Sequence, residues 1–204
     1  METKERIIGA ALELFFRHGV KRITMDDIAR HLSVSKKTIY GFFTDKDEIV
    51  QLACAMQLNK DKCEFETVDN SNKDAVLEIM EKMKHLHEMF SVMNPVLFDD
   101  LQKFHPKTWQ MYLKFKDENL SLMIEKNLRK GIEQKLYRPD INIKILVKLR
   151  IEEVSLGMNA TIFPPNKFYQ SDVQVALLDH FLHGIVTVKG HKLINKYKNI
   201  KDED

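Results

Sequence analysis

Apolar residues recur along the chain at the three- and four-residue spacing of amphipathic helices. One such stripe predicts a helix over residues 4–18, with Gly19 positioned to end it in the left-handed conformation. Further stripes predict long helices over 76–93, 106–128, 143–160 and 172–188, separated by polar or proline-containing breaks. The pattern therefore predicts an all-α fold.

Between these long stripes, residues 24–47 predict short helices joined by a tight turn. Thr24 to Asp27 forms a capping box that opens the first short helix, and Ser33-Val34-Ser35 interrupts it. Ser35 can cap a second helix over residues 36–43. Thr44 to Asp47 reads as another capping box, which opens a longer helix. Two short helices around a three-residue turn predict a helix-turn-helix.

Composition agrees with a packed helical protein and locates its basic residues. The chain has only 7 Gly and 5 Pro among 204 residues, which disfavours collagen-like and turn-dense β folds. Its formal net charge is only +2, so net charge alone does not indicate a nucleic-acid binder. Between residues 17 and 46, however, the chain has seven basic residues and only three acidic ones. A basic surface would therefore be local.

The second short helix carries groups that suit nucleic-acid recognition. Ser35, Lys36, Lys37, Thr38 and Tyr40 can donate to phosphates or base edges, while apolar neighbours face inward. For this segment alone, a solvated polar face is an equally good interpretation.

A longer run of residues favours nucleic-acid recognition over a solvated polar face. It consists of Thr24–Ala29 and Leu32–Tyr40, followed by Phe43, Thr44, Lys46 and Asp47. Together they resemble the N-terminal signature of the tetracycline-repressor (TetR) family of bacterial transcriptional regulators. The resemblance covers about residues 5–50. It implies an N-terminal three-helix DNA-binding domain over 1–47 and a helical-bundle effector-binding and dimerisation domain over 48–204.

The resemblance also implies a function and a set of DNA contacts. We expect a ligand-responsive regulator, a repressor rather than an enzyme, that binds a palindromic operator as a homodimer and needs no cofactor or metal. Ser33 stands where the family usually has a turn glycine, and Gly41-Phe42 replaces a pair that usually offers phosphate contacts. The expected DNA-contacting residues are Thr24, Ser35, Lys36, Lys37, Thr38, Tyr40, Phe42 and Lys46.

Two further sites are expected in the C-terminal part. The final long stripe is apolar over more than one face and needs partners on two sides, which a two-fold dimer interface would supply; burial within one subunit is the alternative. Its expected interface residues are Ala176, Leu177, His180, Phe181 and Gly184. Met and aromatic residues could line a pocket for an apolar or amphipathic small molecule, or simply fill the core. The expected pocket residues are Met83, Phe90, Trp109, Tyr112, Phe115 and Met123.

Other functional classes remain as alternatives. Glu81, His85 and Glu88 share one predicted helix face, which would suit a metal-binding helical bundle or enzyme, although their spacing matches no established ligand motif. A protein-interaction module with a degenerate turn motif is a third hypothesis. The chain shows neither a signal peptide nor an apolar run long enough to span a bilayer, so a cytoplasmic location is expected.

Overall fold

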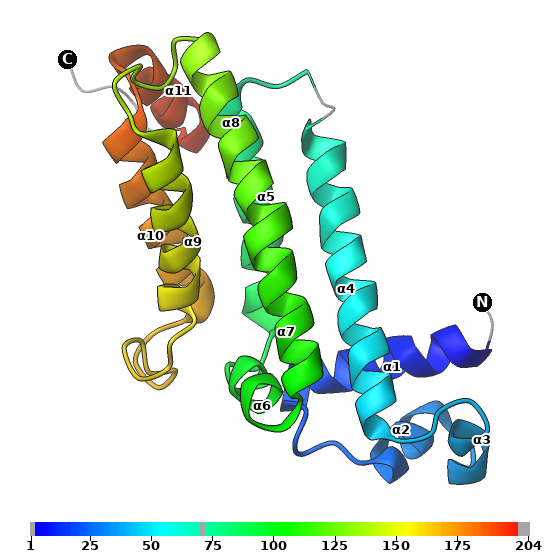
Figure 1. The fold of residues 1–204 in the computed structure, drawn as a ribbon. Coiled ribbons are helices and arrows are strands. Elements are labelled where there is room, and N and C mark those ends of the chain that lie inside the picture. The colour runs from blue at the N-terminus through cyan, green and yellow to red at the C-terminus, as the bar shows by residue number, and fades with distance from the viewer. Residues whose placement is uncertain (1–2, 70–71, 200–204) are drawn as a thin grey trace. The chain divides into compact units, whose positions relative to one another are not determined.

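The computed structural model describes residues 3–69 and 72–199, in which the regular elements are helices (Figure 1). The all-α prediction is confirmed. Two compact units can be separated: residues 1–61 with 92–115, and residues 62–91 with 116–204. The expected functional boundary at residue 47 falls in the first turn of a helix that begins at Lys46, and it remains a prediction.

The first unit contains three N-terminal helices and the beginning of a fourth. These are α1 (Thr3–His18), α2 (Met25–Leu32), α3 (Lys36–Tyr40) and α4 (Lys46–Asp69), of which the first unit includes residues 46–61. Each of these helices has an almost completely buried apolar side chain, in turn Ala11, Ile28, Ile39 and Ile49. Because α2 packs against both α1 and α3, the helix-turn-helix is supported by α1.

Helices α6 (Val96–Phe104) and α7 (Pro106–Phe115) belong to this same unit. The Asn94 backbone N–H donates to Phe16 O at 2.6 Å, and the Lys21 N–H donates to Asp100 Oδ2 at 2.8 Å. At the end of α1, Gly19 has a φ of 78°, and an added Cβ would lie 2.7 Å from Val96 Cγ2. Glycine is therefore required there for both backbone conformation and space.

The second unit is built from α5 (Ala75–Val92), a π-helical turn η1 (Lys116–Leu120), α8 (Ser121–Glu133), α9 (Ile143–Gly157), α10 (Gln170–Ile185) and α11 (Val188–Lys198). Its core includes a buried polar network. The Glu78 carboxylate accepts from Lys82, Asn127 and Lys130 at 2.7 to 3.1 Å, and the Tyr137 hydroxyl donates to Asn127 Oδ1. These bonds join α5, α8 and the segment after α8.

The helices differ from the sequence prediction most clearly in three places. Helix α3 ends at Tyr40 rather than residue 43, and the run predicted from Pro106 is divided by η1. Helix α11 was not predicted, because its sequence is basic and has few apolar residues. Thr187 begins it by accepting from the Gly190 N–H at 3.2 Å, and Ile194 anchors it in the core.

Of the helices in the described residues, none combines the length and the apolar character that a membrane span requires.

Candidate nucleic-acid interface

Helix α2 begins with the predicted capping box. The Asp27 N–H donates to Thr24 Oγ1 at 3.2 Å, and the Thr24 N–H donates to Asp27 Oδ2 at 2.9 Å. The Thr24 hydroxyl also donates to Asp27 Oδ2, at 2.7 Å, and this bond together with the one from the Thr24 N–H holds the pKa of Asp27 below its ordinary value. At the other end of α2, Ser33 adopts the left-handed conformation, with φ 55° and ψ 40°. The turn therefore has a left-handed residue at the position where the resemblance implies glycine.

Helix α3 presents the expected recognition face to solvent. Ser35 caps it by accepting from the Thr38 N–H at 3.0 Å, while Ile39 is fully buried. Lys36 and Lys37 are exposed, and 49% of Tyr40 remains accessible. Burial of Ile39 fixes the rotation of this short helix, so its polar side chains point outward together.

One of these outward side chains has an acidic partner that sequence reasoning did not identify. Lys36 Nζ lies 2.9 Å from Asp26 Oδ2, and this hydrogen bond raises the pKa of Lys36. The pair links α2 to α3 across the turn. No sequence motif indicated this pairing, because the two residues lie ten apart on different helices.

The two remaining expected contacts differ in their surroundings. Phe42 follows α3 and is 42% exposed, as a side chain that contacts the DNA backbone must be. Lys46, at the start of α4, donates from Nζ to Val20 O at 2.6 Å, and burial lowers its pKa. To contact a phosphate, Lys46 would have to exchange this carbonyl for the phosphate oxygens. Both contacts remain predictions.

The predicted capping box at Thr44 to Asp47 is wrong by one residue. Asp45 caps α4 by accepting from the Glu48 N–H at 2.9 Å, and Glu48 accepts from the Thr44 N–H at 2.8 Å. Glu48 therefore supplies the carboxylate that had been assigned to Asp47. Asp47 instead accepts from the ring of His105, with Nδ1 and Oδ1 2.5 Å apart, which lowers the pKa of Asp47.

The expected pocket residues fall in both compact units. Trp109, Tyr112 and Phe115 lie on α7 in the first unit, where the Trp109 and Tyr112 rings are 5.2 Å apart and burial raises the pKa of Tyr112. Met83, Phe90 and Met123 are buried in the second unit. Each set packs inside its own unit, so a single effector site formed by all six residues remains a prediction.

The expected dimer residues lie on α10, and four of the five are accessible in the single chain. Ala176, His180 and Gly184 are exposed and Leu177 is half-buried, whereas Phe181 is buried. On α9, three apolar side chains are also exposed at helical spacing: Ile145, Leu149 and Leu156.

The structure does not support the alternative metal site on α5 (Ala75–Val92). Glu81 forms an ion pair with Lys73, and Glu88 lies 4.0 Å from Lys84 Nζ. His85 packs edge-on against Phe65, with ring centroids 6.1 Å apart. Among the described residues, no group of three or more His, Cys, Asp or Glu side chains is placed to hold a metal ion.

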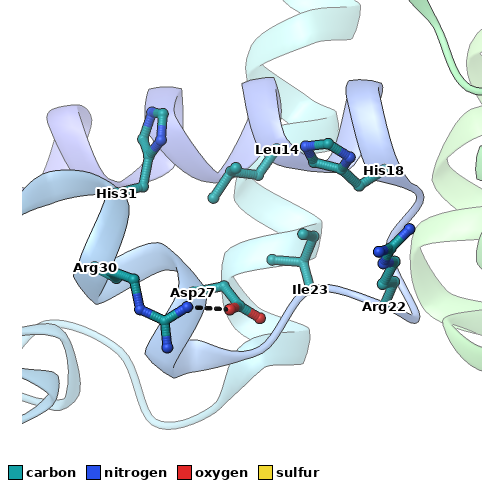
Figure 2. Close-up of a pocket in the computed structure, with 7 residues that line it drawn as sticks. All are labelled: Leu14, His18, Arg22, Ile23, Asp27, Arg30 and His31. Carbon is teal, nitrogen blue, oxygen red and sulfur yellow. Dashed lines mark hydrogen bonds and ion pairs between the residues drawn. The ribbon is translucent and has the colours of Figure 1, made fainter.

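Sequence reasoning missed a hollow between α1, the following loop and α2. Figure 2 shows that His18 and Arg22 lie on one side of it and Arg30 and His31 on the other, with Asp27 between them. Arg22 and Arg30 contributed to the local basic excess, but no motif joined the residues of the hollow. Their proximity follows from the packing of α1 against α2.

Comparison with known proteins agrees with this geometry. The family model described as "Bacterial regulatory proteins, tetR family" matches residues 7–53, which span α1 to the start of α4. The uncharacterized HTH-type transcriptional regulator YvaF of Bacillus subtilis (strain 168) is 22% identical over 182 residues, covering 89% of this chain and 94% of YvaF. The HTH-type transcriptional regulator SrpR of Pseudomonas putida is 39% identical over 64 residues, covering 31% of this chain and 30% of SrpR.

A solved structure extends the similarity of fold to almost the whole chain. A transcriptional regulator from Saccharomonospora viridis, in complex with choline, superposes with a TM-score of 0.70 at 20% identity, covering 90% of this chain and 97% of that one. With the helix-turn-helix geometry, the match over residues 7–53 shows that the chain carries the N-terminal domain of the bacterial regulatory proteins of the tetR family.

Proposed function

We propose that the protein is a ligand-responsive transcriptional repressor that binds a palindromic operator as a homodimer in the cytoplasm. The observation that carries this proposal is the outward face of α3 in a tetR-family helix-turn-helix, where Lys36, Lys37 and Tyr40 are exposed around the buried Ile39. A helix of this kind enters the major groove, and its neighbours contact the phosphates. The role requires no catalytic residue.

In this proposal, Lys37 and Thr38 reach the base edges, and Lys36 contacts the groove after leaving Asp26. The domain is positioned on the DNA backbone by contacts from Thr24, Ser35, Tyr40, Phe42 and Lys46. Because phosphate contacts release counterions, binding should weaken steeply as salt is raised.

Dimerisation would place two copies of α3 about 34 Å apart, one turn of DNA. The exposed stripe on α9 and the accessible face of α10 supply an apolar surface for this role. At Gly184, an added Cβ would meet nothing within 4 Å, so the backbone is open to close approach by a partner helix.

The effector would be an apolar or amphipathic small molecule that prefers a conformation with the recognition helices wrongly spaced. Helices α6 and α7 are suited to transmit this preference within the first unit. The Asn94 and Asp100 contacts join the α6 segment to α1 and its loop, and the His105–Asp47 hydrogen bond joins it to α4. A displacement of α6 would therefore act on both sides of the helix-turn-helix.

Fluorescence anisotropy with DNA from upstream of the protein's own gene tests the proposal, with a scrambled duplex as control. We expect tight, salt-sensitive binding that favours the upstream DNA, and Lys37→Ala should weaken it by about 10-fold. Equal weak binding to both duplexes, unchanged in Lys37→Ala, would contradict this function.

A further inference from the structure

The hollow between α1 and α2 is separate from the expected DNA contacts. It is lined by side chains from α1, from the loop that follows and from α2, and none of them belongs to the recognition face of α3: Leu14, His18, Arg22, Ile23, Asp27, Arg30 and His31. Leu14 and Ile23 are its apolar lining residues, and the other lining residues, which we call its rim, are polar (Figure 2). The hollow is thus an amphipathic depression on the DNA-reading domain.

Positive groups dominate the rim. Arg22 and Arg30 are exposed guanidinium groups, and the rings of His18 and His31 offer further nitrogen donors. Asp27 is the acidic residue in this lining, and its Oδ2 already accepts from the Thr24 N–H and hydroxyl at 2.9 and 2.7 Å. The hollow therefore suits an anion.

The two guanidinium groups keep most of their donors available. Arg30 Nη1 lies 3.5 Å from Asp27 Oδ1, a long contact for a side chain that is 80% exposed. Within the described residues, no carboxylate lies within ion-pair distance of Arg22. Glu13, beside the hollow, is shared between Arg17 at 3.0 Å and His31 at 3.7 Å, so it does not neutralise either arginine of the rim.

The shape and donors together indicate which anion fits. Guanidinium groups bind phosphate oxygens through paired N–H donors, more effectively than a point charge does. An open depression accommodates one group of a large ligand better than it encloses a free small molecule. The hollow also adjoins Thr24, which the family resemblance places at a phosphate.

We propose that this hollow binds a phosphate group, supplied by the DNA backbone beside the segment that α3 reads. Arg22 and Arg30 hold its oxygens, and His18 and His31 donate from the sides. The inference rests on the proposed DNA-binding function and extends it, because it adds a contact made by α1 and its loop. Free phosphate is the other source of the same chemistry.

The test compares three variants by fluorescence anisotropy on a scrambled duplex over a range of salt concentrations. Arg22→Gln and Arg30→Gln remove the proposed contacts, and Arg17→Gln is the matched control, an exposed arginine of α1 that does not line the hollow. We expect each rim variant to bind 3- to 10-fold more weakly and to reduce the salt slope by about 0.9, the value for one lost phosphate contact. Arg17→Gln should change affinity less than 2-fold.

A titration with inorganic phosphate, followed by the NMR signals of His18 and His31, distinguishes the two sources. Unchanged DNA slopes in both rim variants, with a saturable phosphate shift that Arg22→Gln abolishes, would assign the hollow to free phosphate and overturn the DNA contact. Equal losses in all three variants, or no response in either assay, would overturn the site itself. Failure to prefer upstream DNA would contradict only the repressor function, because phosphate contacts are independent of sequence.

Discussion

Single residues set the local geometry of the helix-turn-helix, and Ser33 is the clearest case. Its left-handed backbone closes the turn between α2 and α3, and its exposed side chain gains little from packing there. An L-residue with a Cβ is disfavoured in this conformation by about 1 kcal/mol relative to glycine. The turn is therefore formed in spite of Ser33, through the caps on either side of it.

We predict that Ser33→Gly stabilises the protein. The substitution removes the steric strain, although glycine also increases the freedom of the unfolded chain, so the expected gain in the free energy of unfolding is about 0.5 to 1 kcal/mol. Urea denaturation measures it. Ser33→Ala keeps the Cβ and should show no gain; equal stabilisation by both variants would mean that strain is not the cause.

The hydrogen bond between His105 and Asp47 makes a second prediction at this scale. It holds the pKa of Asp47 below its value in the unfolded chain, so the ionised carboxylate stabilises the fold above about pH 4, and this contribution is lost as the pH falls through the lowered pKa. Because 43% of the Asp47 side chain is exposed, screening limits it to below about 1 kcal/mol.

The measurement is the free energy of unfolding of wild type and Asp47→Asn between pH 3 and pH 7. The two should differ by a constant amount near neutral pH and converge below about pH 4. Curves that stay parallel across the whole range would show that the pair does not contribute through ionisation.

At the scale of elements, the salt bridge between Lys36 and Asp26 connects the two helices of the motif. It fixes α3 against α2, but it also places a carboxylate beside the expected phosphate surface and engages a lysine expected to contact DNA. Since both side chains are about half exposed, the pair contributes less to stability than to the charge that DNA meets.

Asp26→Asn should therefore strengthen DNA binding. Removing the carboxylate ends its repulsion of the phosphates and releases Lys36, so we expect 3- to 10-fold tighter binding and a salt slope steeper by up to about 0.9. Anisotropy at several salt concentrations measures both. Glu66→Gln, which makes the same charge change on the part of α4 in the other unit, serves as control; an equal gain there would indicate a general charge effect.

The same scale shows what could be predicted from the sequence. The stripe over residues 4–18 and the Thr24 box specify their helices locally, because spacing and caps lie within a few residues. The second box was misplaced because Thr44 and Asp45 are both good caps, and the sequence does not indicate that Asp47 is hydrogen-bonded to the distant His105. Helix α11 was missed because its stability comes from Thr187 and the buried Ile194 rather than from its own pattern.

At the scale of the whole molecule, the candidate site residues also divide into those that a local sequence pattern indicates and those that only the packing of separate helices brings together. The expected DNA contacts of α3 could be proposed from the sequence because a short motif carries them. The hollow and the Lys36–Asp26 pair could not, because they arise where separate helices pack together. The single chain also leaves apolar side chains exposed on α9 and on α10, the helix that carries the expected dimer residues.

This exposed surface leads to the last prediction, that Leu149→Lys separates the dimer. Leu149 is 47% exposed on α9, and in a two-fold interface the substitution would occur twice and desolvate two lysines. We expect the dissociation constant of the dimer, measured by analytical ultracentrifugation, to rise at least 100-fold, which corresponds to about 3 kcal/mol. Operator affinity should fall with it, because each half-site would bind alone. Val188→Lys, on α11 and 78% exposed, is the matched control and should remain dimeric; dissociation of that variant instead would move the interface to α11.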